Sequence, residues 1–79
     1  MTLYNFNKLD ELEQHEAIWD SGVYIGERSD GDCRIVLYQL FGFYVELFYH
    51  IEYNVLRKLK SFNNTDLLDD YLTNDTIIL

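Results

Sequence analysis

The chain has 79 residues, with 6 basic and 14 acidic side chains, a net charge of −8 and no proline. This length accommodates one compact domain and not two. An apolar content of 48 % excludes a disordered chain, and a single cysteine excludes a disulfide-held scaffold. The acidic balance disfavours a sequence-blind DNA binder, because such proteins carry a basic surface.

A helix is expected near the N-terminus, over residues 8–20. Asn7 resembles its N-cap, and acidic residues fill the first turns, where they complement the helix dipole. Leu12 and Trp19 are spaced along one side of this helix. Gly22 is expected to end it, at a position with a positive φ.

Three extended segments follow the helix. Residues 23–28 and 34–40 are rich in β-branched and aromatic side chains, and the Asp30-Gly31 pair between them is a strong hairpin signal. Residues 43–49 form the third segment. Its odd positions are all apolar or aromatic, so we expect them to face the core, whereas its even positions form a mixed face.

Residues 51–62 fit two periodicities. Apolar residues recur at helical spacing from Ile51 to Phe62, but Lys58 and Lys60 alternate with other residues as in an edge strand, where lysines are common. We prefer the strand, which would be the fourth of the sheet.

The end of the chain predicts a second, short helix. Thr65 is a suitable N-cap for residues 66–72, and residues 73–79 would then be a docked strand or an exposed apolar end. The predicted fold class is therefore α+β: an N-terminal helix, a four-stranded antiparallel β-meander and a short C-terminal helix, in one domain over residues 1–79.

Several short segments occur in a distinctive order: Leu-Tyr-Asn-Phe-Asn (3–7), Gly-Val-Tyr-Ile-Gly-Glu-Arg (22–28), Leu-Tyr-Gln-Leu (37–40) and Phe-Tyr-Val-Glu (43–46). Together they resemble a group of small uncharacterised bacterial proteins, over about residues 3–72. The resemblance implies a strand over residues 54–62 and a bacterial, phage or mobile-element origin. It implies no catalytic or binding residue, because no activity is established for that group.

Side chains with catalytic or metal-binding potential have plainer roles in this pattern. Cys33 follows the hairpin turn with no histidine at a recognisable spacing, so we interpret it as a small apolar strand residue. His15 and His50 do not make up a four-ligand zinc set, and Asp30-Gly31-Asp32 lacks the remaining ligands of a calcium loop. We therefore expect no enzyme, no metal and no cofactor.

The charge pattern favours a non-catalytic protein-interaction module. Residues 1–20 hold five acids against one lysine, and residues 61–79 hold four acids and no basic residue. Carboxylates spaced along helices can occupy basic grooves that receive phosphates, so the expected partner is a basic protein. By analogy with anti-CRISPR proteins, it would be a nucleic-acid-handling defence enzyme. The predicted binding residues are Asp10, Glu11, Glu13, Asp66, Asp69 and Asp70 for charge, with Tyr44 and Phe48 as anchors.

Two other interpretations stay open. A homodimeric binding module could form through the half-covered sheet face or the edge strand 54–62, and Arg57, Lys58 and Lys60 could contact single-stranded nucleic acid. Three basic residues against a net charge of −8 make direct nucleic-acid binding the weaker of the two. We expect no signal peptide and no membrane-spanning stretch, which needs about 20 apolar residues, and the sequence indicates a cytoplasmic protein.

Overall fold

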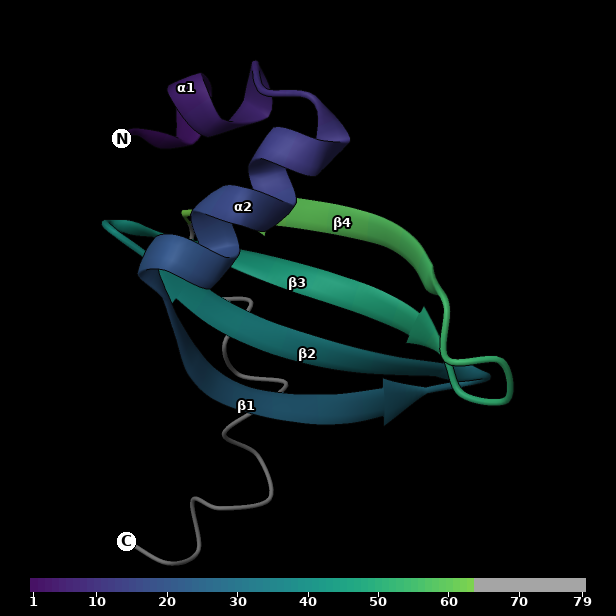
Figure 1. Ribbon diagram of the computed structural model, residues 1–79. Coiled ribbons are helices and arrows are strands. Elements are labelled where there is room, and N and C mark those ends of the chain that lie inside the picture. Colours follow the sequence, from purple (N-terminus) through teal and green to yellow (C-terminus); the bar gives the residue numbers. More distant parts are fainter. Residues whose placement is uncertain (64–79) are drawn as a thin grey trace, which may run out of the picture.

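Two helices and a four-stranded antiparallel sheet make up the fold (Figure 1). The structure is a computed structural model that describes residues 1–63. The helices are α1 (Leu3–Asn7) and α2 (Glu11–Ser21), and the strands are β1 (Gly22–Asp30), β2 (Cys33–Leu40), β3 (Phe43–His50) and β4 (Leu56–Phe62).

The strands lie in the order β1-β2-β3-β4, so each strand pairs with its neighbours in the sequence. The predicted α+β class and antiparallel meander are confirmed, and so is the strand within residues 51–62. Strand β4 lies at an edge of the sheet, as the alternating lysines predict. The predicted C-terminal helix over residues 66–72 and the tail 73–79 lie outside the described residues.

The helical region consists of two helices instead of the single one predicted. Thr2 caps α1, because its Oγ1 accepts a hydrogen bond from the backbone amide of Asn5 at 3.1 Å. Asp10 caps α2: its Oδ1 accepts from the amide of Glu13 at 2.8 Å, and Glu13 Oε1 accepts from the amide of Asp10 at 3.1 Å. The expectation that Asn7 caps this helix is wrong. The reciprocal hydrogen bonds of Asp10 and Glu13 satisfy two backbone amides, and they place the cap three residues after Asn7.

Gly22 joins α2 to β1 without a loop. It is both the C-cap of the helix and the first residue of the strand, with φ −76° and ψ 143°. The positive φ expected at this position is therefore wrong. A Cβ atom here would collide with the backbone carbonyl of Ile18, so glycine is needed for close approach of the two segments.

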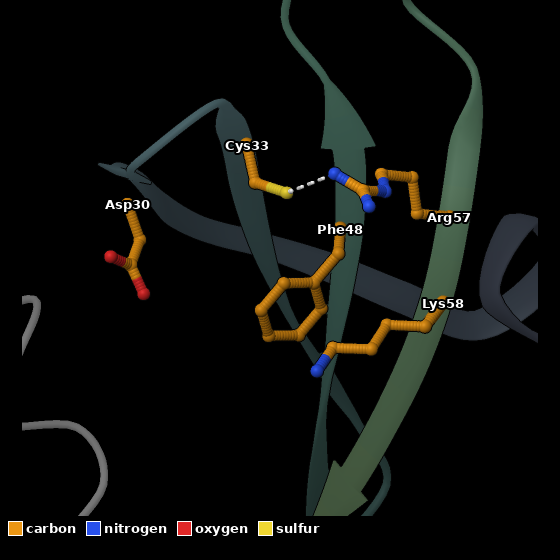
Figure 2. Close-up of a pocket in the computed structure, with 5 residues that line it drawn as sticks. All are labelled: Asp30, Cys33, Phe48, Arg57 and Lys58. Atoms are coloured by element: carbon orange, nitrogen blue, oxygen red, sulfur yellow. Dashed lines mark hydrogen bonds between the residues drawn. The ribbon is translucent and has the colours of Figure 1, made fainter.

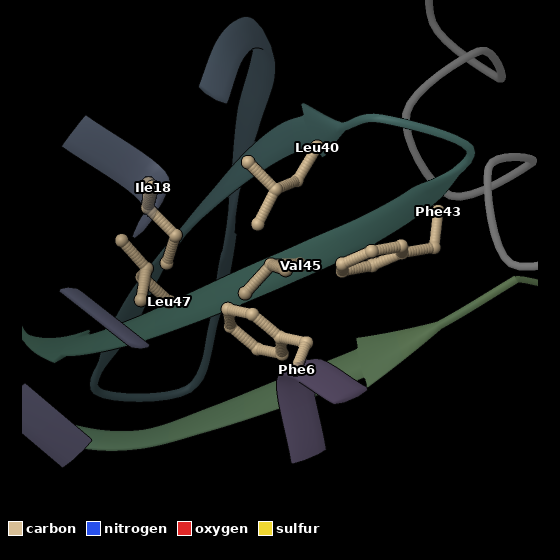
Figure 3. Close-up of a cluster of buried hydrophobic side chains, with 6 residues drawn as sticks. All are labelled: Phe6, Ile18, Leu40, Phe43, Val45 and Leu47. Atoms are coloured by element: carbon tan, nitrogen blue, oxygen red, sulfur yellow. The ribbon is translucent and has the colours of Figure 1, made fainter. Parts of the chain in front are cut away.

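Both helices pack on one face of the sheet, and the core lies between them and the central strands (Figure 3). The rings of Phe6 in α1 and Phe43 in β3 lie 5.4 Å apart, centroid to centroid. The other members of the buried cluster come from α2, β2 and β3: Ile18, Leu40, Val45 and Leu47. The expectation that the odd positions of the third strand face the core is confirmed, with Tyr49 at the margin.

The opposite face of the sheet holds a buried ion pair. Glu46, in the middle of β3, is 2 % exposed, and Arg28 Nη2 lies 3.2 Å from its Oε2. Arg28 belongs to β1, so the pair spans β2. Ile35 and Leu37 of β2 are buried on the same face. The mixed face predicted from the sequence thus combines buried apolar side chains with a paired buried charge.

Gly22→Ala tests the close approach of α2 and β1. We expect the added methyl group to lower the free energy of unfolding by about 1–3 kcal/mol, because it meets rigid backbone. Thermal unfolding followed by circular dichroism measures this as a lower Tm. The matched control is Gly42→Ala, where an added Cβ meets nothing within 4 Å. Equal Tm values for the two variants would contradict the explanation.

Candidate functional site

The binding residues predicted from the sequence do not lie on one surface. Asp10, Glu11 and Glu13 lie at the N-terminal end of α2, on the face of the sheet that the helices cover. The core residues of β3 are at odd positions, whereas Tyr44 and Phe48 are at even positions. Because side chains alternate along a strand, these two rings lie on the opposite face of the sheet. The other three predicted residues, Asp66, Asp69 and Asp70, lie outside the described part of the chain.

The two predicted aromatic anchors are already engaged within the sheet. Tyr44 is half-buried and stacks on Phe62 of β4, with ring centroids 5.6 Å apart. Phe48 is also half-buried, and the ammonium group of Lys58 lies 4.6 Å from the centre of its ring. Contacts of this kind stabilise the β3–β4 pair and leave only part of each ring for a partner.

The most exposed large apolar side chains of α2 lie on its outer surface. Trp19 is 86 % exposed and Leu12 is 67 % exposed, whereas Ile18 is 2 % exposed and points to the core. Three exposed carboxylates lie on the same side of the helix as Trp19 and Leu12. We name this surface the α2 outer stripe; it consists of Leu12, Glu13, Glu16, Trp19 and Asp20.

One charge of the α2 outer stripe, that of Asp20, is not favoured by folding. Helix α2 contains no lysine or arginine, and Asp20 lies in its last turn. The C-terminal end of a helix carries a partial negative charge, so a carboxylate there is repelled. An exposed indole likewise contributes little to folding, because its apolar surface stays in water.

A small hollow borders the stripe. It has a volume of about 50 Å³ and lies between α2 and β3, lined by His15, Ile18, Trp19, Leu47 and Tyr49. The Nε2 atom of His15 is itself buried and has no hydrogen-bond partner within residues 1–63. The sequence grouped Leu12 with Trp19 by spacing, but no sequence signal distinguishes the exposed side of this helix from the buried one.

A larger cavity lies at the far end of the sheet, beside the β1–β2 turn (Figure 2). Its volume is about 340 Å³, and it is lined by Asp30, Cys33, Phe48, Arg57 and Lys58. The thiol of Cys33 is half-buried, and Arg57 Nη1 lies 3.7 Å from its sulfur. Two cations, one carboxylate and one aromatic ring therefore line the cavity. Because the charges are of both signs, the cavity has no strong net charge.

Asp32 links the two turns at this end of the sheet. Arg57 Nη1 donates to both of its carboxylate oxygens at 3.2 Å, and His50 Nε2 lies 3.4 Å from Oδ2. The thiol of Cys33 donates to Oδ1 at 3.6 Å. Partial desolvation alone would raise the pKa of Asp32, but Arg57, the thiol, the backbone and His50 together outweigh it, and the pKa is lowered.

The described part of the chain contains no group of three or more His, Cys, Asp or Glu residues that could hold a metal ion. In the same residues, no helix is long and apolar enough to cross a membrane.

No known family model matches the chain, and no curated protein or solved structure matches it either. Function is therefore inferred from the charge, exposure and geometry of the surfaces described above.

Arg57→Gln tests the electrostatic origin of the lowered pKa of Asp32. We expect the pKa to rise toward its ordinary value, because the largest favourable charge is removed. A carboxyl-detected NMR titration measures it. The control is Lys58→Gln, which removes an equal charge from a side chain that lies over Phe48. Equal shifts in both variants would contradict the specific role of Arg57.

The same pair predicts a pH dependence of stability. The folded-state pKa of Asp32 lies below that of the unfolded chain, so its stabilising contribution is complete above about pH 4. The contribution is lost as the pH falls through the lowered folded-state value. We expect Arg57→Gln to reduce the loss of stability in this acid range, measured by urea unfolding at a series of pH values.

Asp20→Asn tests whether the last acid of α2 opposes folding. We expect the free energy of unfolding to rise by about 0.3–1 kcal/mol, because repulsion from the helix dipole is removed. Glu11→Gln is the matched control: it removes one charge from the first turn, where a carboxylate is favourable, so we expect the opposite sign. Urea unfolding measures both, and destabilisation by Asp20→Asn would contradict the expectation.

Proposed function

We propose that the chain is a non-catalytic, acidic protein-interaction module that binds a basic protein. The observation that carries the proposal is the combination of exposed apolar side chains and carboxylates on α2, in a chain with a net charge of −8. Exposed apolar groups that folding does not require are typical of interaction surfaces. A net negative field accelerates the approach of a positively charged partner and discriminates against acidic ones.

The partner class that best fits this chemistry is a nucleic-acid-handling enzyme. Such enzymes carry basic grooves that receive a row of phosphates, and a row of carboxylates along a helix offers charge of the same sign. In this proposal the protein acts in the cytoplasm as an inhibitor that occupies the groove, as phage-encoded inhibitors of CRISPR enzymes do. That comparison rests on analogy of size and charge.

Direct binding of nucleic acid is less well supported by the contacts of the basic side chains. Arg57 donates hydrogen bonds to both carboxylate oxygens of Asp32. The ammonium group of Lys58 lies over the Phe48 ring. Lys60 is opposite the buried Glu46 in the β3–β4 register. Two of the three cations thus have partners within the sheet, and all three belong to a chain with a net charge of −8 that repels phosphates.

Capture of a partner at two salt concentrations tests the proposed function. The tagged full chain is mixed with a nuclease-treated bacterial lysate, and the retained proteins are identified by mass spectrometry. We expect a basic nucleic-acid-handling enzyme that is retained at low salt and released as salt rises, because screening weakens attraction between exposed charges. Chain recovered alone, at dimer mass, would favour the homodimeric module instead.

A variant with six acids neutralised makes the same experiment specific. Asp10→Asn, Glu11→Gln and Glu13→Gln, combined with Asp66→Asn, Asp69→Asn and Asp70→Asn, remove the predicted charges. Asparagine at the cap position and glutamine three residues later can keep the capping hydrogen bonds, so α2 is expected to stay folded. Unchanged retention of the partner by this variant would contradict binding through the acidic clusters.

A further inference from the structure

The exposed side of α2 has the composition of a binding site with an apolar centre and an acidic border. Leu12 and Trp19 lie seven positions apart, and Glu16 lies between them at helical spacing. Glu13 and Asp20 flank the row on one side. Side chains in this arrangement present two apolar anchors along one line, with carboxylates within reach of whatever covers them.

Two features of this surface have no role in holding the described residues together. Trp19 is the only tryptophan of the chain, and 86 % of it is exposed. Asp20 is placed in the last turn of α2, where the helix dipole repels it. Tryptophan is also the residue type most enriched among energetically dominant contacts at interfaces. Both features are consistent with a surface that is shaped for a partner.

The hollow beside Trp19 adds a third feature. It leaves about 50 Å³ between the helix and β3, and Trp19 is one of the side chains that line it. A partner that covers Trp19 can therefore extend its apolar contact to the edge of this hollow, where Ile18 and Leu47 also lie.

We propose that the α2 outer stripe is the partner-binding site, and that it receives an apolar strip of a basic protein, bordered by lysine or arginine side chains. The inference rests on the proposed function and specifies its interface and the chemistry of the partner. Leu12 and Trp19 supply the apolar contact, and Glu13, Glu16 and Asp20 pair with the basic border. Charge decides between possible occupants, because helix α2 contains four acids and no lysine or arginine, so the same helix of a second copy would be repelled.

The test uses the full chain and two synthetic amphipathic helical peptides. One is built of leucine and lysine and lacks tryptophan, and the other has glutamate in place of lysine. Since Trp19 is the only tryptophan, its emission reports on the stripe itself. We expect the leucine–lysine peptide to shift the emission to shorter wavelength and to protect Trp19 from acrylamide quenching. We expect no effect of the leucine–glutamate peptide.

Matched variants separate the stripe from general charge. Glu13→Gln, Glu16→Gln and Asp20→Asn together are expected to raise the Kd of the leucine–lysine peptide about tenfold, since three ion pairs are lost. Glu27→Gln, Asp30→Asn and Glu52→Gln change the net charge equally outside α2, and we expect a far smaller effect because distant exposed charges are screened. Leu12→Ala tests the apolar contact and is expected to weaken binding, while circular dichroism checks that the variant is folded.

Three results would overturn the inference. They are equal weakening by the two triple variants, equal binding of the two peptides, and peptide binding without any change in Trp19 emission. Failure of the proposed function gives a different result, since no basic protein would then be retained from the lysate. If a basic protein is retained equally well by the chain and by its Trp19→Ala variant, the proposed function stands and the stripe is not its site.

Discussion

The junction at Gly22 determines which surfaces the molecule presents. Because α2 passes into β1 with no loop between them, the rotation of the helix about its axis is fixed where the two segments meet. Ile18 is then held against the sheet, and its neighbour Trp19, one position further around the helix, has to point away. A longer connection would allow the helix to turn and bury the indole. The exposed tryptophan is thus a consequence of the geometry at one glycine.

The sheet is held together by a different constraint on its other face. A carboxylate that is 2 % exposed needs a charged partner or hydrogen bonds, and Arg28 reaches Glu46 from a strand that does not adjoin β3. The pair therefore favours one register for β1, β2 and β3 at once. At the end of the sheet, Asp32 connects the β1–β2 turn to Arg57 of β4. The helices therefore pack on a sheet whose strands are also linked by two side-chain ion pairs, Arg28–Glu46 and Arg57–Asp32.

The sequence predicted the sheet better than the helices and the site. Alternating side chains from Phe43 to Tyr49 and the Asp30-Gly31 turn are local signals, and the structure follows them. The first helix boundary was misplaced because Asn7 and Asp10 are both good caps, and only the Asp10–Glu13 hydrogen bonds decide between them. The exposure of Trp19 was not predictable, since it depends on the close approach of Gly22 to the Ile18 carbonyl rather than on hydrophobicity. Glu46 and Arg28 are 18 positions apart in the sequence, and the periodicity of hydrophobic residues does not predict a pairing over that separation.

The sequential strand order also has a consequence for folding kinetics. Each hairpin of the meander closes a short loop, so the entropy of loop closure is lost in small steps as β1 to β4 assemble. One long-range contact stands apart: the hydroxyl of Ser61 in β4 donates to Asn7 Oδ1 at the end of α1, across 54 positions. Topologies dominated by local contacts fold rapidly, and we expect the sheet of this chain to form early. Docking of α1, which brings Phe6 onto Phe43 as well as Asn7 onto Ser61, closes longer loops and would then follow the sheet.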